Sequence, residues 1–168
     1  ENPDKILRIG LVSADLRKHP VGYFLKPILE NLPSDICFYG YSNTSDCDAL
    51  TRFIQEKCEG WCEIQNFLNH LVAEKIRHDQ IDILFDLAGH TSGNRLAVFA
   101  FKPAPLQITG LGYVDTTGLE RMDYIVSDCF QSPQSEDCFY SEKVWRRDGD
   151  YIVYSPPSID IAVAELPA

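Results

Sequence analysis

The sequence has little positive charge and no long apolar run. Its 15 Lys and Arg residues stand against 25 Asp and Glu, and the net charge of −10 argues against a surface that binds nucleic acid or an anionic membrane. No apolar stretch approaches the roughly 20 residues of a membrane span, and the first residues do not form a signal-peptide pattern. We therefore expect a cytoplasmic protein with neither nucleic acid nor membrane among its partners.

The cysteines lack the spacing of a metal site. The six are Cys37, Cys47, Cys58, Cys62, Cys129 and Cys138. No two of them are spaced as Cys-x-x-Cys, and no histidine stands at a finger-like offset from them. A chain of 168 residues, 45% of them hydrophobic, buries a core without a disulfide framework. We expect reduced thiols and no metal.

Apolar β-type runs alternate with helix-like segments through most of the chain. Strands are predicted at 7–13, 36–42, 60–64, 81–89, 106–114 and 122–126, and helices at 21–32, 46–57, 66–80 and 94–101. The second helix is expected to begin at a cap formed by Ser45 or Asp46. The apolar stripe of the third is expected to comprise Phe67, Leu68, Leu71, Val72 and Ile76.

This alternation predicts an α/β fold, with a Rossmann-like, mostly parallel sheet and helices on both of its faces. The folded domain is expected to span residues 1–150. From Glu142 onward the pattern weakens, and the proline-marked segment 151–168 is predicted to be a linker.

Ligands of such sheets bind beyond the carboxyl ends of the strands, which directs attention to three loops. The candidate site residues in these loops are His19 and Pro20, then Asp86, Gly89, His90 and Thr91, and finally Tyr113, Thr116, Thr117 and Gly118. Hydroxyls, glycines and histidines gathered at one edge suit a hydroxyl-rich ligand such as a sugar or its phosphate. Each residue also has a plainer interpretation, as a solvated histidine, a turn cap or a carboxylate that binds loop amides.

Two further histidines are assigned to structure. His78 ends a helix that leads into a parallel strand, so it is expected at the opposite edge, where its charge complements the helix dipole. His70 lies within the same helix and is expected at the surface. The phosphate-loop, dinucleotide and nucleophile-elbow motifs do not occur in the sequence. A non-catalytic α/β module, such as a flavodoxin-like or receiver-like domain, therefore remains an alternative.

Three stretches carry a family resemblance: "RIGLVSADLRKHPVGYFLKPILENL", "IDILFDLAGHTSGNRLAVFAFKPAPLQITGLGYVDTTGLERMDYIVSD" and "YSEKVWR". Their order and spacing resemble the N-terminal half of the catalytic region of the protein O-linked N-acetylglucosamine transferase family. That family includes plant SPINDLY-like proteins and bacterial members with tetratricopeptide repeats. The resemblance runs from about residue 7 to residue 157.

The resemblance implies half of a GT-B glycosyltransferase, in which two Rossmann-like halves face each other across a cleft. The family transfers N-acetylglucosamine, or fucose in some plant members, from a nucleotide sugar to Ser/Thr hydroxyls, with inversion and without a required metal or other cofactor. By resemblance, His19-Pro20 is the family's His-Pro near the acceptor and sugar, and Gly112, Tyr113, Thr116 and Gly118 belong to its Gly-Tyr loop. His19 is the first candidate to orient or deprotonate the acceptor hydroxyl, and Asp86 or His90 could orient groups or relay a proton.

The sequence departs from the family pattern at two places. Many members read Gly-Tyr-Pro-Gly-Thr-Ser-Gly where this chain has Val114-Asp115 and Thr117, and animal members have tyrosine at the position of His90. The nucleotide-binding half and the repeats are expected outside these 168 residues, as partners in the longer protein, so the isolated chain is expected to be inactive. The donor could also be GDP-fucose, or the half could be degenerate and regulatory.

Overall fold

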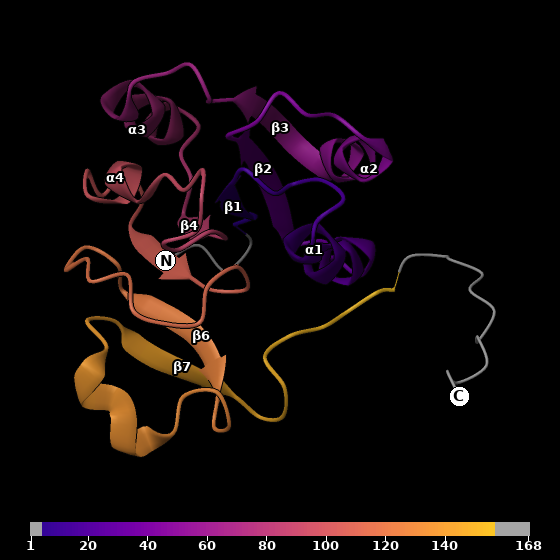
Figure 1. Ribbon diagram of the computed structural model, residues 1–168. Coiled ribbons are helices and arrows are strands. Elements are labelled where there is room, and N and C mark those ends of the chain that lie inside the picture. Colours follow the sequence, from indigo (N-terminus) through magenta and orange to yellow (C-terminus); the bar gives the residue numbers. More distant parts are fainter. Residues whose placement is uncertain (1–4, 157–168) are drawn as a thin grey trace, which may run out of the picture.

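The computed structural model describes residues 5–156 as one seven-stranded sheet with helices packed on it. The strands are β1 (Leu7–Ser13), β2 (Ile36–Ser42), β3 (Cys58–Glu63), β4 (Ile83–Asp86), β5 (Leu106–Thr109), β6 (Tyr124–Asp128) and β7 (Lys143–Arg147). The helices are α1 (Pro20–Glu30), α2 (Ala49–Lys57), α3 (Asn69–His78), α4 (Leu96–Phe99) and the 3₁₀ helix η1 (Gln134–Phe139). Figure 1 shows the arrangement of these elements.

All neighbouring strands are parallel, in the order β3-β2-β1-β4-β5-β6-β7. The chain first moves outward from β1 to β3, then crosses to β4 and moves outward in the other direction. The central strands β1 and β4 are parallel neighbours, and the connections that follow them lead to opposite sides of the sheet. This arrangement defines a switch point between β1 and β4, where ligands of doubly wound sheets bind. The predicted α/β fold with a parallel sheet is confirmed.

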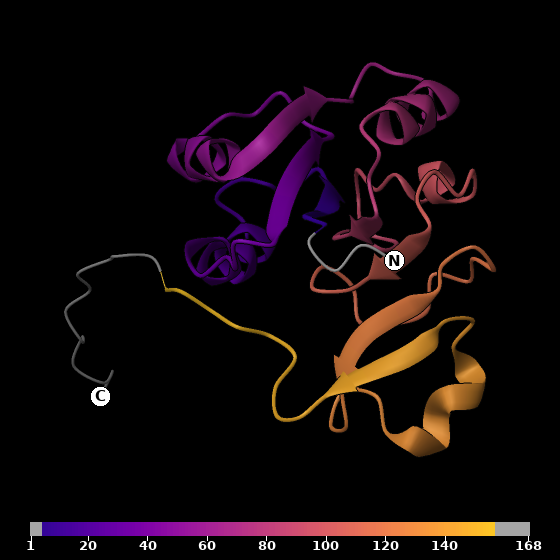
Figure 2. The ribbon, with the colours of Figure 1, turned by 180° about the vertical axis from the view of Figure 1, so that it is seen from behind.

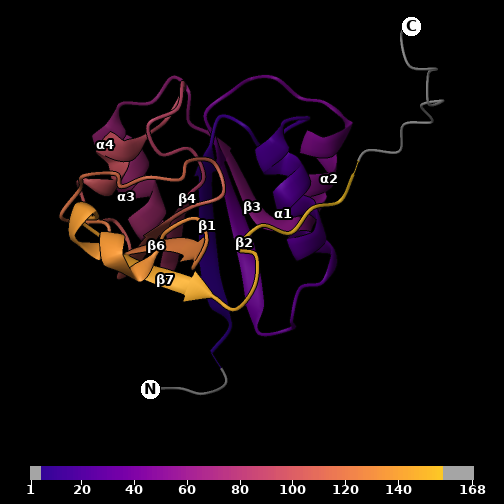
Figure 3. The same ribbon diagram turned by 60° about the horizontal axis from the view of Figure 1, so that its bottom comes forward.

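Two hydrophobic clusters, one on each face of the sheet, form the core. Leu11 and Phe38 of the sheet pack with α1 and α2, whereas Val12 and Leu84 pack with α3 and α4. Side chains alternate between faces along a strand, so consecutive residues such as Leu11 and Val12 enter different clusters. The two pairs of helices lie on opposite sides of the sheet (Figure 3).

The first two strands have the predicted bounds, but details of the helices differ. Asp48 caps α2, since its carboxylate accepts hydrogen bonds from the backbone N–H groups of Leu50 and Thr51, at 2.8 and 3.0 Å; the prediction of Ser45 or Asp46 is wrong. The predicted stripe of α3 is also wrong in part. Its buried residues are Val72, Ala73 and Ile76, while Phe67 and Leu68 precede the helix and, like Leu71, are exposed.

The strand predicted at 106–114 ends at Thr109. Leu111 has a φ of 66°, in the left-handed region, which turns the chain out of the sheet. The turn brings Gly112 against the chain that follows β4, so closely that a Cβ there would lie 1.9 Å from the Leu87 carbonyl oxygen. After the turn Leu111 still packs on the core cluster beneath α1 and α2, whereas Val114, at the end of the apolar run, is exposed.

Strand β7 was not predicted. It is the edge strand of the sheet, and its residues alternate between exposed and half-buried, so it forms no apolar run. The strand pairs with β6 from Lys143 to Arg147, and Arg146 also donates to the carbonyl oxygen of Ser132 at 2.7 Å. Figure 2 shows η1, in orange, beside β6 and β7.

The segment that follows β7 returns across the sheet to α1 (Figure 3). Tyr151 is buried, and the ring of Tyr154 lies edge-on to Tyr23 and Phe24, with centroids 6.4 and 6.1 Å apart. The backbone N–H of Ser155 donates to the carbonyl oxygen of Tyr23. Residues 151–156 of the predicted linker therefore pack on the domain, and residues 157–168 lie outside the described part.

No helix among residues 5–156 has both the length and the apolar character that a membrane crossing requires. The six cysteines all lie in this range and are free thiols.

Candidate functional site

The three predicted loops begin side by side, because β1, β4 and β5 are neighbours in the sheet. Val12 pairs with Asp86, and Asp86 with Thr109, so the strands end at one level. The switch point between β1 and β4 lies within this group. The sequence-based expectation that these loops leave one edge of the sheet is met by the topology.

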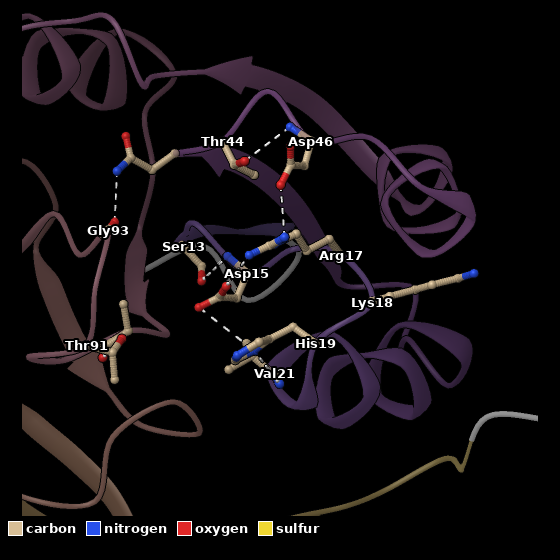
Figure 4. Close-up of polar contacts among 12 residues, drawn as sticks. Ser13, Asp15, Arg17, Lys18, His19, Val21, Thr44, Asp46, Thr91 and Gly93 are labelled. Atoms are coloured by element: carbon tan, nitrogen blue, oxygen red, sulfur yellow. Dashed lines mark hydrogen bonds and ion pairs between the residues drawn. The ribbon is translucent and has the colours of Figure 1, made fainter.

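The loop after β1 holds His19 in place by two contacts (Figure 4). His19 caps α1: its Nδ1 accepts a hydrogen bond from the backbone N–H of Val21 at 3.3 Å, and Pro20 occupies the first helical position. The buried carboxylate of Asp15 lies 3.9 Å from the same Nδ1. A glycine at position 22 lets this turn close, since a Cβ there would lie 2.1 Å from the Arg17 carbonyl oxygen.

The loop after β2 is tied to the loop after β1 by an ion pair and a hydrogen bond. Arg17 Nη1 lies 2.9 Å from Asp46 Oδ2, and the backbone N–H of Lys18 donates to Asp48 at 2.7 Å. Burial alone would raise the pKa of Asp48, but hydrogen bonds from Lys18, Thr51 and Leu50 outweigh it and hold that pKa below its ordinary value. This carboxylate is therefore charged at neutral pH and fastens the His19 loop to the start of α2.

The loop after β4 is organised by Asp86, whose side chain is fully buried. The carboxylate accepts hydrogen bonds from the backbone of Ala88 and Gly89, at 3.2 and 2.8 Å, and from the Thr109 hydroxyl at 2.8 Å. Burial raises the pKa of Asp86, and these hydrogen bonds oppose that rise. Because the carboxylate faces the loop, any role of Asp86 in chemistry acts through the loop's shape.

Thr91 is used within the same loop. Its hydroxyl donates to the carbonyl oxygen of Ala88 at 2.7 Å. The loop then reaches the β2 side of the switch point, where the Asn43 side chain donates to the Gly93 carbonyl oxygen at 2.8 Å (Figure 4). The three loops that follow β1, β2 and β4 thus form one bonded surface.

His90 and Tyr113 join the loops that follow β4 and β5. The two rings meet edge-on, and the His90 Nε2 lies 3.0 Å from the carbonyl oxygen of Thr117. Tyr113 packs on Gly89, which has a φ of 53°; a Cβ at that position would lie 2.2 Å from the Tyr113 Cβ. Both the close approach and the backbone angle require glycine there.

Thr116 and Thr117 are bound by a residue that the sequence did not indicate. The buried carboxylate of Glu142 accepts hydrogen bonds from the Thr116 hydroxyl at 2.7 Å, from the Thr117 backbone N–H at 2.8 Å and from the Thr117 hydroxyl. Glu142 directly precedes β7 and so lies at the amino end of that strand. The threonines that bind it therefore lie where the chain returns toward the start of β6, and not at the carboxyl end of β5. The only sequence signal for Glu142 was its place in "YSEKVWR".

The structure thus groups the predicted residues in two sets. One set is His19 with Asp15, beside the switch point; the other is His90 with Tyr113 and Thr117. The hydroxyls of Thr91, Thr116 and Thr117 are engaged inside the loops, and their contact with a ligand stays a prediction. His70 and His78 are exposed on α3, and His78 lies in its last turn as predicted.

Two hollows of the surface are relevant to a ligand. A groove of about 430 Å³ opens beside the loop after β5, between Val114 and Asp115 on one side and Phe139 on the other. A larger hollow of about 690 Å³ lies at the amino edge of the sheet, near Lys5, Arg8 and Asp82. Its charged side chains are engaged within the chain: Lys5 pairs with Asp82, and Arg8 and Arg77 donate to backbone carbonyl oxygens.

Within residues 5–156 no group of three or more His, Cys, Asp or Glu side chains could hold a metal ion. What the arrangement offers instead is hydrogen bonding: two imidazoles, a tyrosine and several loop backbones. Such groups bind and orient hydroxyls and phosphates.

Comparison with known proteins gives a consistent result. The model of glycosyl transferase family 41 matches residues 1–153. The probable UDP-N-acetylglucosamine–peptide N-acetylglucosaminyltransferase SPINDLY of Oryza sativa is 35% identical over the whole chain, and the Caenorhabditis elegans UDP-N-acetylglucosamine–peptide N-acetylglucosaminyltransferase is 33% identical over 82% of it. A solved structure of a mutant O-GlcNAc transferase from Thermobaculum terrenum has a TM-score of 0.89 and 40% identity over 94% of the chain.

These relatives are much longer than the chain. It spans 19% of the rice protein, 12% of the Caenorhabditis elegans protein and 30% of the Thermobaculum terrenum chain. The similarity therefore describes one part of a larger protein.

Proposed function

The chain belongs to glycosyl transferase family 41, and on this basis we propose that the protein containing it transfers N-acetylglucosamine from UDP-N-acetylglucosamine to Ser/Thr hydroxyls of proteins. The observation that carries the proposal is the alignment of the chain, at a TM-score of 0.89, with an O-GlcNAc transferase. The loops at the carboxyl edge of the sheet hold the candidate site residues. Family membership disfavours the alternative of a non-catalytic α/β module.

The chemistry of an inverting transfer sets what the site has to supply. The acceptor hydroxyl attacks the anomeric carbon from the face opposite the diphosphate, so hydroxyl, sugar and leaving group have to be held in line. His19 orients the hydroxyl, since its ring is fixed at the start of α1 beside Asp15 and its Nδ1 already accepts from the Val21 backbone N–H. Tyr113 and His90 line the sugar side. Transfer proceeds without a metal or other cofactor.

The 168-residue chain supplies one wall of this cleft. The relatives are three to five times longer or more, so the second half of the cleft and any repeats lie in the rest of the protein. One wall cannot hold both the acceptor and the diphosphate, and the isolated chain is therefore inactive. We further propose that the whole protein acts in the cytoplasm on protein acceptors.

The test is a transferase assay of the full-length protein with a panel of Ser/Thr peptides. UDP-N-acetylglucosamine is compared with GDP-fucose as donor, each with and without a metal chelator. Transfer of N-acetylglucosamine that persists with the chelator supports the proposal. Transfer of fucose alone would assign the other donor, and turnover by the isolated chain would contradict the single-wall role.

A further inference from the structure

Glu142 is a buried carboxylate whose role in the proposed reaction is not evident from its position before β7. Its side chain is only 5% exposed, yet within residues 5–156 no Lys or Arg forms an ion pair with it. Burial of an uncompensated charge is costly, so its partners have to repay that cost by hydrogen bonds. All of these partners come from two consecutive residues, Thr116 and Thr117.

The hydrogen bonds fix the loop as a unit. The Thr116 hydroxyl, while donating to Glu142, accepts from the backbone N–H groups of Gly118 and Ser141, both at 3.1 Å. Gly118 has a φ of 70°, which closes the turn. The segment Thr116–Gly118 is therefore held to the chain before β7 at several points, and its carbonyl groups have fixed directions.

One of these carbonyl groups determines the tautomer of the His90 ring. The Thr117 oxygen lies 3.0 Å from the His90 Nε2, and a carbonyl oxygen can only accept a hydrogen bond. The proton of the neutral ring is therefore on Nε2, and Nδ1 carries the free lone pair. His90 presents a hydrogen-bond acceptor to whatever lies against its other nitrogen.

His19 presents a hydrogen-bond donor, in contrast to the acceptor of His90. The backbone N–H of Val21 donates to its Nδ1, and the carboxylate of Asp15, at 3.9 Å, is too far away to accept from that atom. The neutral ring of His19 therefore carries its proton on Nε2, which is the nitrogen left for a ligand. The site thus combines a donor imidazole at His19 with an acceptor imidazole at His90.

We propose that Glu142 is a positioning residue of this site. Through the Thr116–Gly118 segment it holds the Thr117 carbonyl against His90, so that His90 Nδ1 accepts a hydrogen bond from a hydroxyl of the bound sugar or acceptor. The ligand part of this proposal rests on the proposed function. The positioning part concerns the chain's own residues and has a separate readout.

That readout is the side-chain N–H signal of His90 in proton–nitrogen NMR spectra of the 168-residue chain. Although His90 is exposed, a bonded Nε2 proton exchanges more slowly than an unbonded one and is visible at low temperature, and His90→Gln assigns it among the four histidines. We expect the signal in the wild type and in Glu142→Gln, whose amide oxygen still accepts from the loop, and its loss in Glu142→Ala. Thermal unfolding of each variant checks that the chain is folded.

Asp128 provides the matched control. Like Glu142 it is a buried carboxylate that binds backbone amides, those of Phe130 and Gln131 at 2.8 Å and of Tyr151 at 3.2 Å, but it has no hydrogen bond to Thr117 or His90. Asp128→Ala should destabilise the chain and keep the His90 signal. A Glu142→Ala chain that is folded and keeps the signal, or an Asp128→Ala chain that is folded and loses it, would overturn the positioning role.

Kinetics of the full-length protein test the ligand part. Because misplacement of a site group by about 1 Å can cost on the order of 10²-fold in rate, Glu142→Ala should lower kcat/KM by roughly that factor. Glu142→Gln should recover most of the loss, and Asp128→Ala should remain within about threefold, well below that factor. Equal losses in Glu142→Ala and Asp128→Ala would reject a specific effect. An inactive wild type would reject the proposed function and leave the NMR result to decide the positioning role.

Discussion

The ring of His90 lies edge-on to the ring of Tyr113, with 5.5 Å between centroids and 79° between planes. This contact joins the loop after β4 to the loop after β5, over a glycine that allows no side chain. Aromatic pairs of this geometry are favourable by about 0.5–1.5 kcal/mol beyond their burial. The contact therefore helps to fix how these two loops lie at the sugar side of the proposed cleft.

The glycine beneath that contact should not tolerate a methyl group. Gly89→Ala would place a Cβ 2.2 Å from the Tyr113 Cβ at a positive φ, so we expect a loss of roughly 3 kcal/mol or more in the free energy of unfolding. Gly118→Ala is the matched control, because its φ is also positive but no atom lies within 4 Å of the added Cβ. It should lose only about 1–2 kcal/mol. Urea denaturation measures both, and equal losses would show that packing at Gly89 is unimportant.

His19 has a structural role and a proposed chemical role, which one substitution can separate. Asn caps helices well, so His19→Asn should retain the cap of α1 and unfold within about 0.5 kcal/mol of the wild type, whereas His19→Ala should lose about 1 kcal/mol. Both should lower the transferase rate of the full-length protein, by about 10²-fold if the His19 ring orients the acceptor hydroxyl. A rate within about threefold of the wild type in either variant would exclude that role.

The buried carboxyl of Asp86 should make stability depend on pH. Its pKa in the folded chain is raised above the ordinary value of 3.8, so folding favours the protonated form. The stabilisation due to this group is complete below pH 3.8 and is lost as the pH rises through the folded value. The difference in unfolding free energy between wild type and Asp86→Asn should therefore shift against the wild type as the pH increases. Denaturation at a series of pH values tests this, and a shift in the other direction would contradict it.

Stability can also be gained away from the site. Gln80 follows α3 with a φ of 54°, in the left-handed conformation that glycine adopts without strain at helix ends. Gln80→Gly should raise the unfolding free energy by about 1 kcal/mol. Gln80→Ala, which keeps the strain, should leave it unchanged or slightly lower. Thermal unfolding distinguishes the two, and a destabilised glycine variant would show that the Gln80 side chain matters more than the backbone.

The sequence predicted the buried, apolar part of the fold better than its exposed part. Strands β1 and β2 are mostly apolar, and their bounds were predicted correctly. Strand β7 was missed because one of its faces meets solvent and its residues are mostly charged. The early end of β5 depends on the backbone angle of Leu111, which the apolar pattern does not express.

The candidate site, like the fold, could be predicted only in part. Its loops could be predicted because the carboxyl ends of parallel strands meet at one edge. The partners of Thr116 and Thr117 could not, because Glu142 lies about 25 residues away in the chain and reaches them only after β6 and β7 have paired. Local sequence rules describe caps and turns, whereas this contact depends on the tertiary fold.

The returning segment of residues 151–156 connects the edge strand β7 with α1, which packs on strands at the other side of the sheet. Tyr154 packs against α1, the helix that His19 caps, while the segment itself is continuous with the edge strand β7. Segments with few buried apolar contacts open first in local unfolding, and no residue of β7 is fully buried. Here opening of β7 would also withdraw an aromatic ring from α1, so the edge strand and the His19 helix are expected to exchange their amide protons as one cooperative unit.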